Sequence, residues 1–225
     1  MNANDTTQNP LLTIGHSNME ASAFMKLLQQ HKIQTVADVR SSPYSQYTPQ
    51  FNREALQATL KQNGISYVFL GDELGARRAE RECYESGQAV YELIAKTPLF
   101  NAGLERLLAG AKKFRIALMC AEKDPLTCHR TILVCRNLKI AGLEIQHIHS
   151  DGHLESHAEA EQRLLQTLKL PTDDFFAKPR KYWMKPTRCR ERKLHMPRKR
   201  RENHRRFRPP YEQSATQILE VEISH

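Results

Sequence analysis

Short apolar runs alternate with helix-like patterns between residues 11 and 168, and this alternation limits the fold more than any other feature of the chain. Runs with the length and composition of buried strands are expected at 11–14, 35–39, 65–70, 114–119 and 144–149. Apolar residues at helical spacing predict helices at 20–31, 52–64, 88–96, 99–111, 127–141 and 155–168. Such alternation builds βαβ units. We therefore predict an α/β fold of three layers, in which helices cover both faces of a mostly parallel five-stranded sheet.

The composition divides the chain into three parts. Residues 1–10 are polar and are expected to be a disordered lead, and residues 11–170 hold the predicted α/β domain. Residues 171–225 are basic and contain prolines, and they are expected to be a C-terminal extension of low structure. Its stretch 178–208 carries fifteen of the chain's 34 Lys and Arg residues but only two acidic residues. This stretch alone has a net charge of +13, so it accounts for the chain's net charge of +9, and the residues outside the stretch are mildly acidic.

Several absences narrow the functional class. No apolar run reaches the roughly 20 residues needed to span a bilayer, so no membrane partner is expected. The polar N-terminus lacks the features of a secretory signal. Five cysteines are an odd number in a chain without export features, which predicts reduced thiols and a cytoplasmic location. The residues predict no cofactor, and they leave the oligomeric state and the question of enzymatic activity open.

Polar and reactive side chains follow the predicted strands. In an open parallel sheet, ligands bind outside the carboxyl ends of the strands, so residues that end different strands are expected to share one site. The candidates for this site are His16, Ser17, Asp38, Arg40, Cys120, Glu122, Cys128, His129 and Arg130. The last three also begin a predicted helix, where free N–H groups and the helix dipole favour thiolates and anions.

The same residues fall in blocks that resemble a known family. The blocks are Thr13–Ser17, Asp38–Arg40 with Pro43, Leu70–Gly75, and Met119–Glu122 with Cys128–Arg130. In this order they are similar to the signature of the domain-of-unknown-function 488 family, over about residues 11–150. The resemblance implies an α/β domain with a polar cleft, and it supplies no established reaction.

Cys128 is the candidate nucleophile, because a thiol at the start of a helix ionises more easily than a free thiol. His16 and Glu122 are the candidate groups that move protons in catalysis. A second interpretation explains Cys128 equally well, namely a small buried thiol that packs the start of the helix.

Arg40 and Arg130 are the candidate anion binders, since a guanidinium offers paired N–H donors to a phosphate or carboxylate. Asp38, Ser17 and His129 complete the candidate substrate site. These roles predict a small anionic ligand, with a phosphate-bearing or nucleotide-like substrate as the leading hypothesis. In the alternative interpretation, Arg40 pairs with Asp38 or Glu122 and only holds the loops together.

A thiol redox or metal sensor built on Cys120 and Cys128 is a further alternative. A zinc set of these cysteines with His129 and His16 is only weakly indicated, because the chain has no CxxC pair, and no metal ligand is assigned. The spacing of four later histidines fits no metal motif, so they are expected to be solvated. These are His147, His149, His153 and His157.

The basic stretch 178–208 suggests a different function. Its positive charges are interleaved with Tyr182, Trp183 and Phe207, and five prolines between 179 and 210 prevent a long helix. Basic segments with scattered aromatic residues bind nucleic-acid backbones through charge and stacking. The chain is therefore a candidate non-catalytic nucleic-acid-associated module, as an alternative to an enzyme.

Overall fold

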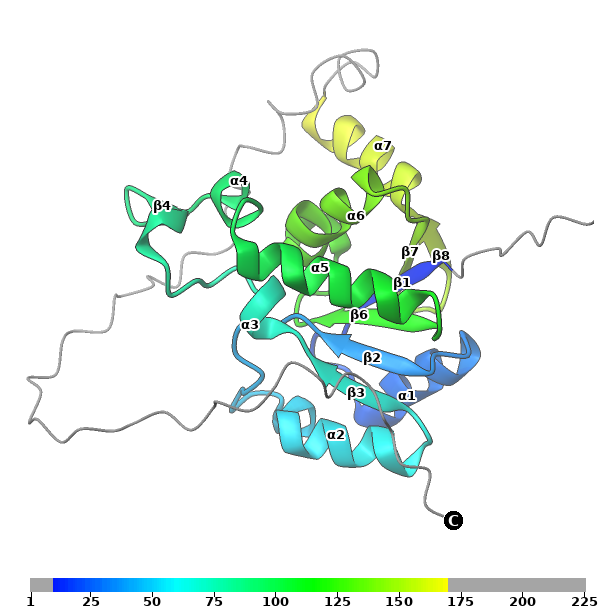
Figure 1. Cartoon of the computed structure of the whole chain (residues 1–225). Helices are drawn as coiled ribbons and strands as arrows, with labels where there is room; N and C mark the ends of the chain where they lie inside the picture. Colours follow the sequence, from blue (N-terminus) through cyan, green and yellow to red (C-terminus); the bar gives the residue numbers. More distant parts are fainter. Residues whose placement is uncertain (1–9, 170–225) are drawn as a thin grey trace, which may run out of the picture. The chain divides into compact units, whose positions relative to one another are not determined.

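The structure is a computed structural model, and it describes residues 10–169 (Figure 1). The predicted lead lies outside these residues except for Pro10, and so does the whole extension 171–225. Within residues 10–169, no helix is long and apolar enough to cross a membrane. The cytoplasmic location stays a prediction.

A six-stranded sheet forms the centre of the described domain, with strand order β3-β2-β6-β1-β7-β8. Its strands are β1 (Leu11–Gly15), β2 (Thr35–Asp38), β3 (Ser66–Phe69), β6 (Ile116–Cys120), β7 (Ile145–Ile148) and β8 (Leu154–Ser156). Every neighbouring pair is parallel except β7 and β8. The five strands expected from the sequence are confirmed. The three-layer α/β class is therefore correct, and the sheet is mixed at one edge.

The strand β8 corrects the prediction of five strands and of a helix starting at residue 155. A turn at Gly152, whose φ is +89°, reverses the chain after β7. The returning residues pair antiparallel to β7, with Ser156 opposite Gln146. The last helix, α7 (His157–Leu168), starts only after Ser156, whose side chain accepts a hydrogen bond from the Glu159 amide. The Glu159 side chain accepts from the Ser156 amide in return, and this capping box determines where the helix begins.

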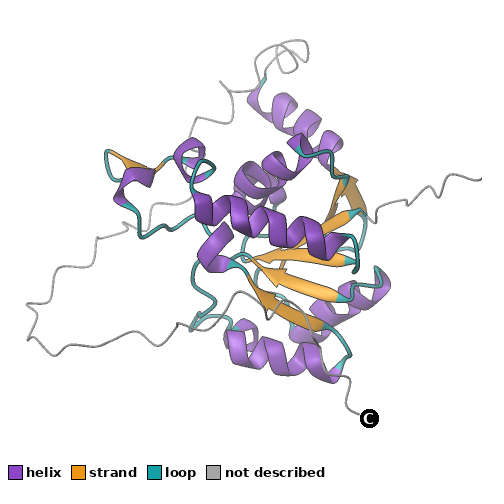
Figure 2. Ribbon diagram, viewed as in Figure 1, coloured by secondary structure: helices purple, strands orange, loops and turns teal. Residues whose placement is uncertain are grey.

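Helices cover both faces of the sheet (Figure 2). The helices α1 (Ala21–Gln30) and α2 (Arg53–Gln62) pack on one face, where Leu12 and Ile14 of β1 contact their apolar residues. The other face is covered by α3 (Gly71–Leu74), α5 (Pro98–Ala111) and α6 (Arg136–Ile140). Alternate residues of one strand serve the two cores, as expected for side chains that point to opposite faces.

Residues 81–97 differ from the predicted helix at 88–96. They form a short 3-10 turn (Arg81–Cys83), a two-stranded hairpin of β4 (Tyr84–Glu85) and β5 (Gln88–Ala89), and the four-residue helix α4 (Tyr91–Ile94). The two hairpin-turn residues, Ser86 and Gly87, both have positive φ. Two-residue hairpin turns favour this conformation. The turn therefore places residues 88 and 89 in a strand and not in the predicted helix.

The predicted helix at 127–141 is also divided. A 3-10 turn, η3 (Pro125–Thr127), comes first, followed by an extended Cys128. A π-helical segment, η4 (Arg130–Cys135), then leads into α6. The Asp124 side chain accepts a hydrogen bond from the Leu126 amide and so stabilises the separate first turn. Cys128 consequently lies just before the helix and not within its first turn.

Candidate functional site

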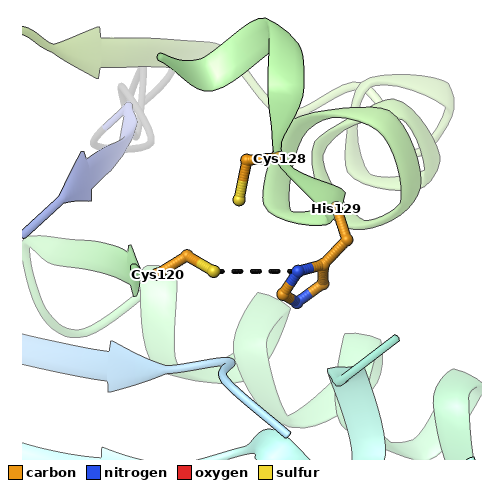
Figure 3. A group of neighbouring side chains, drawn as sticks. All are labelled: Cys120, Cys128 and His129. Carbon is orange, nitrogen blue, oxygen red and sulfur yellow. Dashed lines mark hydrogen bonds between the residues drawn. The ribbon is translucent and has the colours of Figure 1, made fainter. Parts of the chain in front are cut away.

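Two thiols, an imidazole and a carboxylate meet at the carboxyl edge of the sheet, and we call these four residues the thiol cluster. Cys120 ends β6, Glu122 follows in the loop, and Cys128 and His129 precede η4. Glu122 Oε2 lies 3.1 Å from Cys120 Sγ and 3.4 Å from Cys128 Sγ. Cys120 Sγ lies 3.7 Å from His129 Nδ1. Figure 3 shows the two thiols and the imidazole directed toward a common centre.

The backbone around Cys128 explains its position. Its carbonyl accepts hydrogen bonds from the amides of Thr131 and Ile132, which begins the helix. The Arg130 amide lies 3.4 Å from Cys128 Sγ and donates to the sulfur. The thiol therefore occupies the place where capping oxygens normally accept a helix N–H group. This contact favours the thiolate form of Cys128.

His129 is oriented by a backbone contact to a neighbouring strand. Its Nε2 lies 2.9 Å from the carbonyl oxygen of Val39, directly after β2. A carbonyl only accepts, so we assign the proton of the neutral ring to Nε2. The Nδ1 lone pair is then directed at the sulfurs.

The two thiols have opposite electrostatic environments. Burial opposes ionisation of Cys128, but its hydrogen bond with Cys120, the charge of Arg130 and its contact with His129 hold its pKa well below the ordinary range. The hydrogen bond with Cys128, together with burial, raises the pKa of Cys120 well above that range. Burial lowers the pKa of His129, yet its contact with Cys128 outweighs this and raises it. The cluster therefore favours one thiolate and one protonated thiol.

Arg130, a predicted anion binder, is completely buried. Its Nη1 donates to the Glu122 carbonyl at 2.6 Å, and its Nη2 donates to the Lys123 carbonyl at 3.2 Å. The side chain thus fixes the loop that carries Glu122, and we call this contact the loop clamp. Its positive charge also helps to hold the pKa of Cys128 low.

Arg40, His16 and Asp38 form a second group beside the thiol cluster. Arg40 Nη2 lies 2.6 Å from Asp38 Oδ2 and also donates to the Phe51 carbonyl. Arg40 Nη1 lies 3.1 Å from His16 Nε2, and His16 Nδ1 lies 2.8 Å from the Ser17 carbonyl. The ion pair considered as the alternative for Arg40 is therefore present.

Burial and the charge of Arg40 lower the pKa of His16 to about 4, so this imidazole is neutral at physiological pH. It stacks on Phe51, which belongs to the core beneath α1 and α2, whereas both cysteines belong to the opposite core. Within residues 10–169, no side-chain hydrogen bond joins His16 to Cys128 or Glu122. Ser17 is half-buried, and its amide donates to the Ala121 carbonyl.

Two contributors do not follow from the sequence pattern. Tyr67 donates from its hydroxyl to Asp38 at 2.9 Å, and the Val39 carbonyl orients His129. The tyrosine lies in a strand where an aromatic residue predicts packing alone. Cys120, by contrast, follows from the sequence. Its position at the end of a predicted strand indicated that it could be a redox partner of Cys128.

Gly15 allows the loop to approach β1. A Cβ at this position would lie 1.9 Å from the Glu122 carbonyl oxygen and 2.9 Å from Arg130 Nη1. We expect Gly15→Ala to lower the free energy of unfolding by about 3 kcal/mol, because backbone must move to admit the methyl group. Urea unfolding measures the loss.

Gly64→Ala is the matched control for Gly15→Ala. Gly64 has a φ of +71° but no atom within 4 Å of an added Cβ. Its substitution is expected to cost about 1 kcal/mol, from backbone strain alone. If the two variants lose the same free energy of unfolding, the close contact of Gly15 with the Glu122 loop adds no cost of its own.

Comparison with known proteins identifies one family. A family model described as "Domain of unknown function DUF488" matches residues 20–136, which includes the whole thiol cluster. No curated protein and no solved structure matches the chain.

Proposed function

The chain belongs to the DUF488 family, whose description names no activity. From the geometry of the thiol cluster, we propose a thiol-dependent function in which Cys128 is the reactive thiolate and Cys120 is the resolving thiol. One observation carries this proposal. A single carboxylate oxygen, Glu122 Oε2, lies within hydrogen-bond reach of both sulfurs, at 3.1 Å and 3.4 Å. One base can therefore accept the proton of either thiol.

The chemistry follows from these contacts. The Cys128 thiolate attacks one oxygen of a peroxide and the O–O bond breaks. The leaving hydroxide or alkoxide takes up the proton that Cys128 lost on ionisation, so that a sulfenic acid and water or an alcohol are left. The Cys120 thiol then attacks the sulfenic sulfur, a disulfide forms, and hydroxide leaves. Glu122 accepts the proton of Cys120 and returns it to the hydroxide, so that this step releases one water. Two electrons pass from the two thiols to the peroxide in total.

We expect stoichiometric hydrogen peroxide to produce one disulfide, between Cys120 and Cys128, in a Cys189→Ser background. Peptide mapping by mass spectrometry identifies the bond. In Cys120→Ser the reaction is expected to stop at a sulfenic acid on Cys128, which dimedone traps. Glu122→Gln is expected to slow disulfide formation at least about tenfold, because it removes the general base.

Cys135→Ser is the control for peroxide reactivity, since Cys135 is buried in the core and burial raises its pKa. It is expected to react like the parent. Oxidation that spreads over all cysteines, or an absence of the Cys120–Cys128 bond, contradicts the proposal.

The hypothesis of a phosphate-bearing or nucleotide-like substrate has less support from the geometry. The donors of Arg40 are directed at Asp38, His16 and the Phe51 carbonyl. Nη1 and Nη2 of Arg130 are directed at backbone carbonyls, and only its buried Nε has no partner among residues 10–169. A cavity of about 210 Å³ lies beside Arg77 and Arg78, but Asp72 and Glu80 also line it, so its charges balance. We therefore place thiol chemistry first. Nucleic-acid binding by residues 178–208 lies outside the described residues and stays a prediction.

A further inference from the structure

We infer that the thiol cluster is also a binding site for one soft divalent cation of the zinc class. Its donors would be Sγ of Cys120, Sγ of Cys128 and Nδ1 of His129, with Glu122 Oε2 as the fourth. The two sulfur atoms and His129 Nδ1 all lie within 4.8 Å of one another. Thiolate sulfur, imidazole nitrogen and carboxylate oxygen are the ligands that Zn²⁺ takes in proteins.

The distances between the donors fit a tetrahedral ion. Zinc bonds of ≈ 2.3 Å to sulfur and ≈ 2.0–2.2 Å to nitrogen or oxygen separate the ligand atoms by roughly 3.5–3.8 Å. The Cys120 sulfur lies 3.7 Å from His129 Nδ1. Glu122 Oε2 lies 3.1 Å and 3.4 Å from the two sulfurs. Among these pairs, the carboxylate oxygen has to move only slightly away from the two sulfurs to admit the ion.

The surroundings of the donors support this inference. A metal-binding histidine usually donates its other ring N–H to a carbonyl or carboxylate, which fixes the direction of the free nitrogen. His129 makes this contact through Nε2 to the Val39 carbonyl at 2.9 Å. The Arg130 amide donates to Cys128 Sγ, and the Arg130 side chain fixes the Glu122 loop. Three of the four donors are thus oriented by groups that bind no metal themselves.

Burial distinguishes this site from a surface cluster. Cys120 is 3% exposed and Cys128 is 1% exposed, while His129 and Glu122 are half-buried. The sulfurs are therefore largely enclosed by protein, and the imidazole and the carboxylate are the donors that stay partly exposed. A closed set of four protein ligands is typical of zinc sites that hold structure or control thiol reactivity.

The cation site goes beyond the proposed thiol function and does not require it, although both use the same sulfurs. A bound ion would occupy the lone pair with which Cys128 attacks. We therefore expect one equivalent of Zn²⁺ to prevent the formation of the Cys120–Cys128 disulfide, and removal of the ion by a chelator to restore it.

The test uses the full chain, reduced and treated with chelator, and titrated with Co²⁺ and then Zn²⁺. We expect one equivalent of Co²⁺ to produce the intense visible bands of a tetrahedral ion and near-ultraviolet sulfur-to-cobalt charge transfer. One equivalent of Zn²⁺ should remove both signals. Cys120→Ser and Cys128→Ser should each weaken binding at least about 100-fold, since each removes a direct ligand.

Cys135→Ser and His153→Asn are the controls for cation binding, because they alter a buried thiol and an exposed imidazole away from the cluster. Both should bind Co²⁺ like the parent. Weak binding without thiolate charge transfer in the parent overturns the inference, and this measurement does not depend on whether any variant folds. Full affinity in both cluster cysteine variants overturns it as well.

The two proposals can fail separately. A metal-free chain that binds Co²⁺ through thiolates but forms no Cys120–Cys128 disulfide keeps the cation site and rejects the redox function. A chain that forms the disulfide but gives no thiolate-cobalt signal keeps the redox function and rejects the cation site.

Discussion

Lowering the pH from 7 to 4 is expected to reduce the free energy of unfolding of the described domain by about 5–7 kcal/mol, because two buried histidines are neutral in it. His147 is 1% exposed and His157 is 4% exposed. Thr13 Oγ1 lies 2.8 Å from His147 Nδ1, and His147 Nε2 lies 3.1 Å from His157 Nδ1. With both rings neutral, Thr13 Oγ1 can donate to His147 Nδ1 while His147 Nε2 donates to His157 Nδ1, and a proton added to either Nδ1 removes an acceptor from this chain.

The electrostatic surroundings explain the size of the acid effect. Burial, then the neighbouring His157 and Arg130, lower the pKa of His147 to about 3, against a smaller opposing effect of Glu155. Burial and Lys139 lower the pKa of His157 to about 4, and Glu155 again opposes. The Glu161 carboxylate also faces His157 Nε2 at 3.5 Å.

The direction of the pH dependence follows from proton binding. In the unfolded chain both histidines bind protons below their ordinary pKa of about 6.5, whereas the folded state keeps them neutral to about pH 4. The unfolded state therefore binds more protons in this range. The two neutral histidines stabilise the folded state fully above pH 6.5. Between pH 6.5 and about pH 4, the free energy of unfolding falls by about 1.4 kcal/mol per histidine for each pH unit.

Urea unfolding followed by circular dichroism at pH 7, 6, 5 and 4 measures this dependence. His157→Gln removes one of the two groups and should reduce the slope between pH 6 and 4 by about half. His153→Gln is the control, because the side chain of His153 is 57% exposed. A slope that is the same in the parent and in both variants shows that the buried pair is not its cause.

Arg130→Met should lower the free energy of unfolding by about 3–5 kcal/mol, since it leaves two loop carbonyls without their charged donor. The guanidinium is fully buried and donates to the Glu122 and Lys123 carbonyls. Methionine has a similar length but no donor, so packing changes little while the loop clamp is lost. Hydrogen exchange at residues 121–126 should quicken in the variant, and peroxide should form the Cys120–Cys128 disulfide more slowly.

Arg136→Met is the control for the loop clamp. Arg136 lies in the next helical segment, and its ion pair with Glu92 spans 3.7 Å at a partly exposed position. An ion pair of this kind contributes less than about 1 kcal/mol. If Arg130→Met destabilises the chain no more than Arg136→Met does, the loop clamp does not determine the stability of the loop.

The sequence predicts the parallel strands well because each is a short apolar run whose neighbours in the chain are polar. The strand β8 has no such run. Its central residue is Glu155, which is buried because Arg163 and His149 contact its carboxylate. In the sequence, a charged residue such as Glu155 indicates a helix or a loop, because the side chains that neutralise it in the strand cannot be read from the sequence. The expectation that the four later histidines are solvated is wrong for His147 and His157 for the same reason, since each is the other's partner.

The position of the candidate site at the carboxyl edge of the sheet follows from the sequence, because topology brings the ends of parallel strands together. The sequence does not show which of these residues form the reactive group. Cys120 and Cys128 are eight positions apart, and only the loop clamp and the extended Cys128 bring their sulfurs to one carboxylate oxygen. The role of Arg40 depends on Asp38, two residues away, and on the backbone carbonyl of Phe51. The role of Arg130 depends on backbone carbonyls, which leave no trace in the side-chain pattern.

The sequence by itself determined the α/β class, the five parallel strands and the edge at which reactive side chains gather, because apolar periodicity is a property of neighbouring residues. The tertiary structure alone decided that Cys120, Glu122, Cys128 and His129 form one group. It also decided that Asp38 neutralises Arg40. Hydrogen bonds and ion pairs of buried groups are selected by distance in three dimensions, and the order of the residues does not contain that distance.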